Sequence, residues 1–160
     1  MAIIFNADEI LQAAEQIERN GAQFYILAAD RLTEFGGVFR KLAGQEEKHL
    51  AVFQKMRSSL SAAEREETAY DPDNQSSLYL KTMADREVFN VYEDQTKLFF
   101  PSISVANIID IAIGKEKDSI VFYVGLKELA PENIGGAKLD LVISEEFSHI
   151  AVLRGMLMGR

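Results

Sequence analysis

Cysteine is absent from the 160-residue sequence, which excludes disulfides, iron–sulfur clusters, zinc–thiolate sites and thiol redox chemistry. Proline occurs only three times, so long stretches contain no residue that would break a helix. Basic residues are outnumbered, with 17 Lys and Arg against 25 Asp and Glu and a formal net charge of −8. Because binding to nucleic acid or to an anionic membrane needs a basic face, we expect neither partner.

Long hydrophobic runs are also missing. No apolar run approaches the length of a membrane span, and Ile3-Ile4-Phe5 is too short for the core of a signal peptide. We therefore expect a soluble, cytoplasmic protein. The chain length and the 48% hydrophobic fraction predict a single domain over residues 1–160 that buries a substantial core.

Histidine is rare as well, because the chain has only two. Each closes a Glu-x-x-His motif, from Glu46 to His49 and from Glu146 to His149. Residues three apart lie on the same face of a helix, one turn from each other. A single motif of this kind is weak, so the prediction depends on its repetition.

Apolar residues at steps of three and four predict the first helical hairpin, residues 6–60. Asn6 can cap its first helix, with Glu9 completing a capping box. Gly36-Gly37 should end that helix. A second helix follows at once, and so short a gap makes the two helices antiparallel neighbours.

The rest of the chain is expected to form a crossover and a second hairpin. Residues 61–103 begin polar and acidic and continue as a weaker amphipathic segment over 78–99, which predicts a long crossover that contains a helix. Ser104 can cap the third helix, and a glycine pair at 135–136 separates it from the fourth. The second hairpin is thus expected over residues 104–160.

Each of the four main helices carries a glutamate on its predicted buried face: Glu18, Glu46, Glu116 and Glu146. Four ionised carboxylates cannot share a dry core without positive charge, and no Lys or Arg lies on these faces. Two divalent cations would balance them, with both imidazoles neutral. Oxygen and nitrogen ligands suit iron or manganese best, admit zinc or cobalt, and argue against calcium.

The two hairpins repeat one another. The segment from Glu18 to Tyr25 matches that from Glu116 to Tyr123, and the two Glu-x-x-His segments match likewise. Two similar hairpins can pack about a pseudo-twofold axis, so that each delivers one lone Glu and one Glu-x-x-His to a common layer.

With this constellation the chain resembles rubrerythrin-type ferritin-like proteins over nearly its whole length. The most specific residues are Ile17-Glu18, Phe24-Tyr25, Gln45-Glu46-Glu47-Lys48-His49, Lys115-Glu116-Lys117-Asp118-Ser119-Ile120 and Glu146-Phe147-Ser148-His149. The resemblance implies an all-α, ferritin-like four-helix bundle with a long helical crossover between the second and third helices. It implies metal ligands at six positions: Glu18, Glu46, His49, Glu116, Glu146 and His149.

Within this set, the resemblance places Glu46 and Glu146 nearest their own histidines. The lone Glu18 and Glu116 would either bridge the two metal ions or be terminal ligands of one ion. No catalytic residue is expected beyond the metal centre.

The chain departs from rubrerythrins at two points. Rubrerythrins carry a rubredoxin domain with four cysteines, so a chain without cysteine would take electrons from a separate rubredoxin-like protein. Rubrerythrins also have a further glutamate one turn after the third-helix ligand, where this chain has Ser119, whose repeat counterpart is Gly21. Small residues at both positions would leave room for dioxygen, peroxide or water.

Four more residues lie close to the expected ligands in sequence. Tyr25 and Tyr123 are expected to hydrogen-bond the glutamate seven residues earlier, because helical side chains lean toward the N-terminus. Glu47 and Glu145 fall off the buried face, so we expect both on a solvated surface.

The leading prediction is a homodimeric, rubrerythrin-like oxidative-stress protein that uses two iron ions to reduce hydrogen peroxide or dioxygen. One alternative is a ferroxidase or iron-binding protein without cage storage, since the chain ends eleven residues after His149 and leaves no room for a fifth helix. The other is a non-redox metal-binding protein, loaded for example with zinc.

Overall fold

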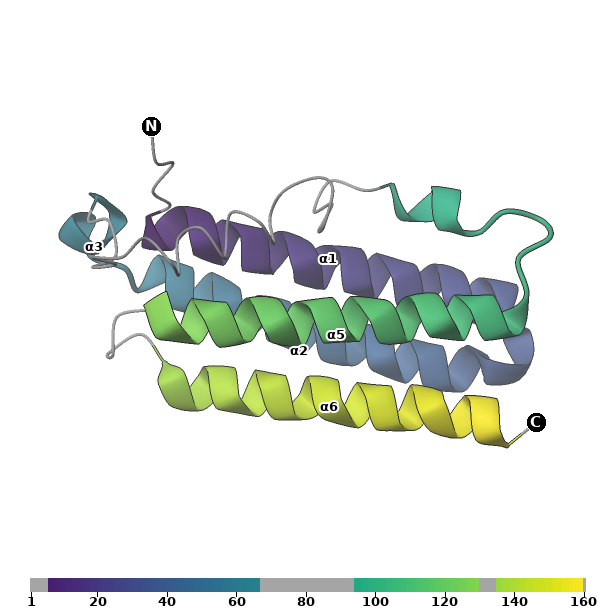
Figure 1. Cartoon of the computed structure of the whole chain (residues 1–160). Helices are drawn as coiled ribbons and strands as arrows, with labels where there is room; N and C mark the ends of the chain where they lie inside the picture. The colour runs from purple at the N-terminus through teal and green to yellow at the C-terminus, as the bar shows by residue number, and fades with distance from the viewer. Residues whose placement is uncertain (1–5, 67–93, 130–134, 160) are drawn as a thin grey trace.

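The structure of the chain is a computed structural model that describes residues 6–66, 94–129 and 135–159 (Figure 1). Within these ranges the chain is helical and has no strand. The long helices are α1 (Ala7–Arg31), α2 (Gly36–Ser58), α5 (Val105–Leu129) and α6 (Gly136–Met158). The short ones are α3 (Ala62–Glu66) and the 3-10 helices η1 (Thr33–Phe35) and η2 (Gln95–Leu98). The predicted all-α four-helix bundle is therefore confirmed.

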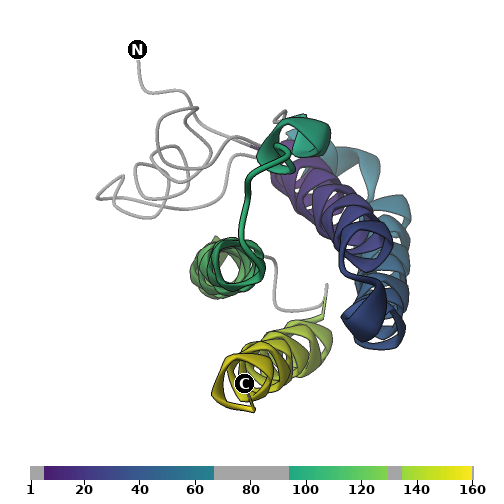
Figure 2. The ribbon, with the colours of Figure 1, turned by 90° about the vertical axis from the view of Figure 1, so that its right-hand side faces the viewer.

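The four long helices form two antiparallel hairpins, α1 with α2 and α5 with α6 (Figure 1). Viewed along the bundle, α5 lies beside α1 and α6 lies beside α2 (Figure 2). The crossover starts at α3, at one end of the bundle, and η2 leads into α5 at the opposite end. The third helix consequently runs antiparallel to the first.

The predicted caps are present. The Asn6 side-chain oxygen accepts a hydrogen bond from the Glu9 amide at 2.9 Å, and the Glu9 carboxylate accepts one from the Asn6 amide at 3.2 Å. The Ser104 hydroxyl accepts a hydrogen bond from the Asn107 amide at 3.1 Å. Each cap satisfies backbone donors that the first helical turn leaves unpaired.

The prediction that the glycine pair at 36–37 ends the first helix is wrong. Helix α1 ends at Arg31, η1 follows, and α2 begins at Gly36, whose φ of −54° is helical. A Cβ at Gly36 would lie 3.3 Å from the carbonyl oxygen of Ala29. This glycine therefore allows the first turn of α2 to approach α1 closely.

Little of the crossover falls within the described residues. Of the helix expected over 78–99, only residues 94–99 are described, and they contain η2, whose first turn is capped by the Asp94 side chain. At the other end, Arg57 makes two hydrogen bonds to Asp8 at 2.9 and 3.0 Å, and Arg65 binds the same carboxylate. Asp8 thereby ties the start of the crossover to the first turn of α1.

The apolar core is divided into two clusters along the bundle axis. One is built around Leu11, Phe53, Phe122 and Leu139, and the other around Phe24, Phe39, Ile109 and Leu153. On every long helix one buried glutamate lies between the residues of the two clusters: Glu18, Glu46, Glu116 and Glu146. Helix α1 buries a second one, Glu15, which pairs with Arg19 and Arg57.

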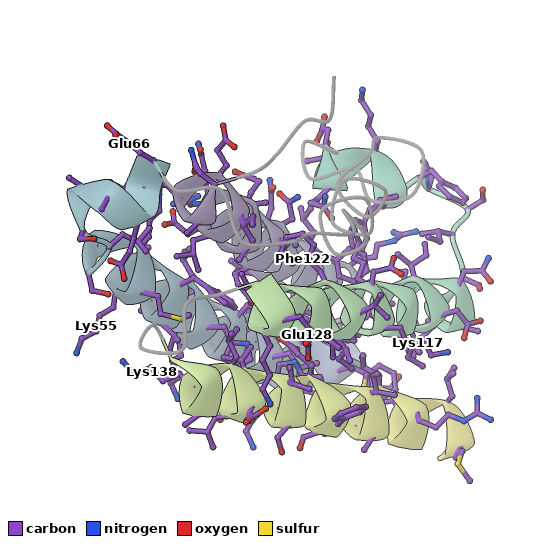
Figure 3. All side chains as sticks on the ribbon, turned by 60° about the vertical axis from the view of Figure 1, so that its left-hand side comes forward. Lys55, Glu66, Lys117, Phe122, Glu128 and Lys138 are labelled. Atoms are coloured by element: carbon purple, nitrogen blue, oxygen red, sulfur yellow. The ribbon has the colours of Figure 1, made fainter. Side chains whose placement is uncertain are left out.

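Most charged side chains elsewhere in the bundle point to the surface. Lys55, Lys117 and Lys138 extend outward, whereas Phe122 is enclosed between the helices (Figure 3). The buried carboxylates are therefore an exception to the charge distribution of the rest of the bundle. Among the described residues, no helix combines the length and the apolar character needed to span a bilayer.

Candidate metal centre

The layer between the two apolar clusters holds all six residues that the sequence singles out. Each of them is at most 4% exposed: Glu18, Glu46, His49, Glu116, Glu146 and His149. Burial follows from their registers, because each lies three or four residues from apolar side chains that face the bundle axis.

These residues form two overlapping groups. The first comprises Glu18, Glu46, His49 and Glu146; the second comprises Glu46, Glu116, Glu146 and His149. Within each group, one candidate ligand atom per residue lies within 4.8 Å of all the others. Glu46 and Glu146 belong to both groups. The lone glutamates, Glu18 and Glu116, belong to one group each.

The inner nitrogens of both histidines face carboxylates from the opposite hairpin. His49 Nδ1 lies 3.0 Å from Glu146 Oε1, and His149 Nδ1 lies 3.1 Å from Glu46 Oε1. Glu146 also reaches its own histidine, with 2.9 Å between Oε2 and His149 Nδ1. The expectation that Glu46 lies nearest His49 is thus wrong, because its carboxylate extends across the bundle toward α6.

Close approach in this layer does not amount to hydrogen bonding. Buried atoms without a hydrogen-bond partner include Glu18 Oε2, Glu46 Oε1, both Glu146 oxygens and both histidine Nδ1 atoms. The nitrogen–oxygen distances among them are short, but the atoms are not aligned as donors and acceptors. Buried polar atoms are rarely left unpaired in proteins. Their lone pairs converge on the space between the helices, and cations placed there would satisfy them.

Without cations, the carboxyl groups of this layer are hard to ionise. Burial raises the pKa of Glu18, Glu46 and Glu116 above the ordinary carboxyl range. Neighbouring carboxylates raise the pKa of Glu46 and Glu116 further, through like-charge repulsion. In the metal-free chain, protons can therefore take the place of the missing positive charge.

The pKa values of both histidines are raised, as expected for imidazoles beside carboxylates. Burial disfavours the imidazolium, but Glu146 and Glu18 outweigh it and raise the pKa of His49 to about 11. For His149, Glu116 and Glu146 likewise outweigh burial and raise the pKa to about 12. Burial opposes ionisation of Glu146, but the two histidines lower its pKa to about 2. In the metal-free site, both imidazoles therefore favour the protonated form beside an ionised Glu146.

Both tyrosines hydrogen-bond a glutamate, but the predicted partner, the glutamate seven residues earlier, is wrong in each case. Tyr25 donates to Glu116 Oε1, and Tyr123 donates to Glu18 Oε1. Seven residues along a helix correspond to about 10 Å, too far for a tyrosine to reach the glutamate on its own helix. Since α1 and α5 run antiparallel, each tyrosine lies level with the glutamate of the other helix. Burial raises the pKa of both phenols, which therefore remain donors.

Gly21 makes room for the carboxylate of Glu46, one of the candidate metal ligands. A Cβ at this position would lie 2.6 Å from Glu46 Oε2, so any larger residue would displace that carboxylate. Its repeat counterpart, Ser119, is 8% exposed, and its hydroxyl donates to the carbonyl of Lys115 at 3.0 Å. The Ser119 hydroxyl is therefore paired with its own helix.

The sequence interpretation missed one residue of the site. Glu145 is half-exposed, as expected off the buried face, yet its Oε2 lies 2.5 Å from His49 Nε2. A carboxylate on the outer nitrogen of a histidine fixes the ring orientation and makes the inner nitrogen a better metal ligand. Its repeat counterpart in the first hairpin is Gln45, which cannot supply that charge. The pair of acids, Glu145-Glu146, was the available sequence signal.

Comparison with known proteins bears on the fold. No family model matches the sequence, and no curated protein matches it significantly. A solved structure from Thermotoga maritima, described as a candidate ferritin-like diiron-carboxylate protein, aligns with 24% sequence identity and a TM-score of 0.76. The alignment covers 96% of this chain and 95% of that one. At this identity the similarity establishes a ferritin-like fold, which confirms the expectation from sequence.

Proposed function

We propose that the six buried residues bind two iron ions. Glu18 and His49 would hold one ion, Glu116 and His149 the other, with Glu46 and Glu146 between them. The observation that carries this proposal is the convergence of unpaired buried oxygen and nitrogen atoms on the same interior space. Two divalent cations would also balance the four carboxylates, which no Lys or Arg in the described part of this layer neutralises.

Iron is favoured by the chemistry of the donors and supported by the similar fold. Carboxylate oxygens together with imidazole nitrogens suit iron and manganese, whereas calcium avoids imidazole. The Thermotoga maritima protein of similar fold is described as a diiron-carboxylate candidate.

We further propose that the chain is a rubrerythrin-like cytoplasmic oxidoreductase that reduces hydrogen peroxide or dioxygen. When bound, the iron pair would supply two electrons to the O–O bond. The chain itself buries the site from water, and the hydroxyls of Tyr25 and Tyr123 hold the two terminal carboxylates in place. Because the chain has no cysteine, electrons would come from an external rubredoxin-like protein. A homodimer is the proposed assembly.

The test begins with metal content after anaerobic purification, followed by stopped-flow absorbance on mixing the reduced protein with peroxide or with air. We expect two irons per chain and a near-ultraviolet band that grows much faster with peroxide. A faster response to air would favour the ferroxidase alternative. Bound zinc and no absorbance change after iron loading would favour a non-redox role. Metal content unchanged by Glu46→Ala and His49→Ala would refute the ligand assignment.

A further inference from the structure

The outer nitrogens of the two histidines have different surroundings. His49 Nε2 is paired with the carboxylate of Glu145 at 2.5 Å. His149 Nε2 is equally buried, in a side chain only 1% exposed, and has no hydrogen-bond partner among the described residues. The residue that would supply one by symmetry is Gln45. One half of the site thus lacks a carboxylate that the other half has.

The vacant side of His149 borders a pocket between α2 and α6. Its volume is about 400 Å³, and it is lined by Gly37, Val38, Lys41, Leu42, Gln45, Ser148, His149 and Val152. The Nδ1 edge of the His149 ring faces Glu46, Glu116 and Glu146, so the Nε2 edge is turned away from the carboxylates. An unpaired buried donor therefore meets a space large enough for a small molecule.

The polar groups around this pocket favour an anion. Lys41 supplies a positive charge, and Gln45 supplies amide hydrogens. The pocket also includes Gly37 and Val38 from the first turn of α2, which has no side-chain cap and no acidic residue, so the positive dipole end of this helix favours an anion there. No Asp or Glu is among the lining residues, although the chain as a whole carries a net charge of −8.

The rest of the lining restricts what the anion can be. Val38, Leu42 and Val152 form an apolar wall, and Val38 and Val152 also border an adjoining pocket of about 700 Å³. That second pocket provides room for an apolar tail. It contains the carboxylate of Glu34, which would repel a second negative group on the ligand. A monocarboxylate fits this arrangement better than a dicarboxylate.

We propose that this pocket binds a small aliphatic monocarboxylate, one oxygen of which accepts a hydrogen bond from His149 Nε2. The bound carboxylate does for His149 what Glu145 does for His49. It also carries a consequence that depends on the proposed metal site. By holding the His149 ring, the ligand strengthens that ring as a ligand to its ion, so a metabolite could regulate one half of the centre.

The test uses the full chain without metal, labelled with 15N at histidine, and follows the ring nitrogens by NMR at fixed pH and ionic strength. Sodium acetate and sodium butyrate are the probes. We expect a saturable change at His149 Nε2 and none at His49 Nε2, which Glu145 already occupies. Two further methylene groups against the apolar wall should make butyrate bind about tenfold more tightly than acetate.

Two variants and a matched control sharpen the assignment. Gln45→Glu should abolish the response, because its own carboxylate then lies where the ligand binds. Lys41→Gln should weaken binding about fivefold through loss of one charge, whereas Lys55→Gln, on the same helix but outside the pocket, should leave it unchanged. An unchanged His49 signal in each variant verifies that the site remains folded.

Several results would overturn the proposal. These are the absence of a saturable change at His149, equal changes at both histidines, or equal effects of the two lysine substitutions. A response to inorganic phosphate but not to butyrate would show that the pocket binds phosphate instead of a monocarboxylate. Because the measurement needs no metal, its failure would leave the proposed iron site standing, and failure to bind iron would leave this result intact.

Discussion

The two hairpins supply the same candidate ligands but differ just outside them. Each contributes one lone glutamate and one Glu-x-x-His, and each tyrosine crosses to the glutamate of the other hairpin. Beyond this layer the symmetry ends, because Glu145 pairs with His49, whereas His149 Nε2 has no hydrogen-bond partner among the described residues and His149 lines a pocket together with Gln45. The comparison indicates that the inner layer is alike in the two hairpins, whereas the residues around it would make two bound ions chemically unequal.

The largest effect on metal content should come from removing a carboxylate that belongs to both candidate metal-binding groups. Glu146→Gln removes a carboxylate that belongs to both candidate groups, so we expect the bound metal to fall from two ions per chain to none. Glu18→Gln affects one group only and should leave one ion. Inductively coupled plasma mass spectrometry of the purified variants measures both. Equal losses in the two variants would contradict the bridging role of Glu146.

The next largest effect should follow from filling the space beside Glu46. Gly21→Ala places a methyl group where the carboxylate lies, and overpacking of this kind costs about 2 kcal/mol. We expect metal binding weaker by about thirtyfold, measured by competition with a chelator.

Gly44→Ala is the matched control for this prediction. Gly44 also lies within a long helix, but a Cβ there meets nothing within 4 Å. This variant should bind metal normally and be more stable by about 0.5–1 kcal/mol, because Ala favours a helix interior. A similar loss of metal affinity in both variants would show that steric conflict with Glu46 is not the cause.

A smaller effect should result from making the outer layer symmetric. Glu145→Gln gives His49 the same kind of neighbour that His149 has, and loss of such a carboxylate lowers metal affinity about tenfold. We expect the loss to fall on one ion of the two, so stepwise titration with metal should show one weakened and one unchanged step. Weakening of both steps to the same extent would count against separate control of the two halves.

The smallest effect should be on the pH dependence of stability. The pKa values of Glu18, Glu46 and Glu116 are raised by burial, and those of His49 and His149 are raised by carboxylates. A raised pKa stabilises the fold fully below the unfolded-state value, which is 6.5 for histidine, and this stabilisation declines as pH rises from there toward the raised value. The metal-free chain should therefore melt a few degrees lower at about pH 8 than at about pH 6.

Metal should reverse this trend, because ligands must lose their protons to bind it. The increase in melting temperature caused by metal should thus be greater at the higher pH. Thermal unfolding with and without a chelator, at both pH values, provides the comparison. A metal-free chain that becomes more stable as pH rises would contradict the directions of these pKa shifts.

The six candidate ligands could be predicted from sequence because helical spacing alone determines which residues share a face. Glu46 and His49, for example, remain on one buried face whatever lies opposite. The partners of Tyr25 and Tyr123 could not be predicted in this way, since they depend on how α1 and α5 are aligned. Glu145 was missed for the same reason, because its role depends on a histidine in the other hairpin.

The prediction that the glycine pair at 36–37 ends the first helix was wrong for a different reason. Glycine is common after the last turn of a helix, and the prediction relied on that preference. Here Gly36 has a helical conformation and serves the contact between two helices, with Ala29 opposite it. Local preference cannot distinguish a glycine needed for its backbone angles from one needed for its small size.

The charged layer between the two apolar clusters also has a consequence for how the bundle unfolds. Each cluster joins all four long helices at its own end, but without cations the layer between the clusters contains buried carboxyl and imidazole atoms that lack hydrogen-bond partners. The metal-free molecule can therefore open from one end while the other remains packed. Two ions, held by residues from every helix, would couple the ends and make unfolding a single cooperative event.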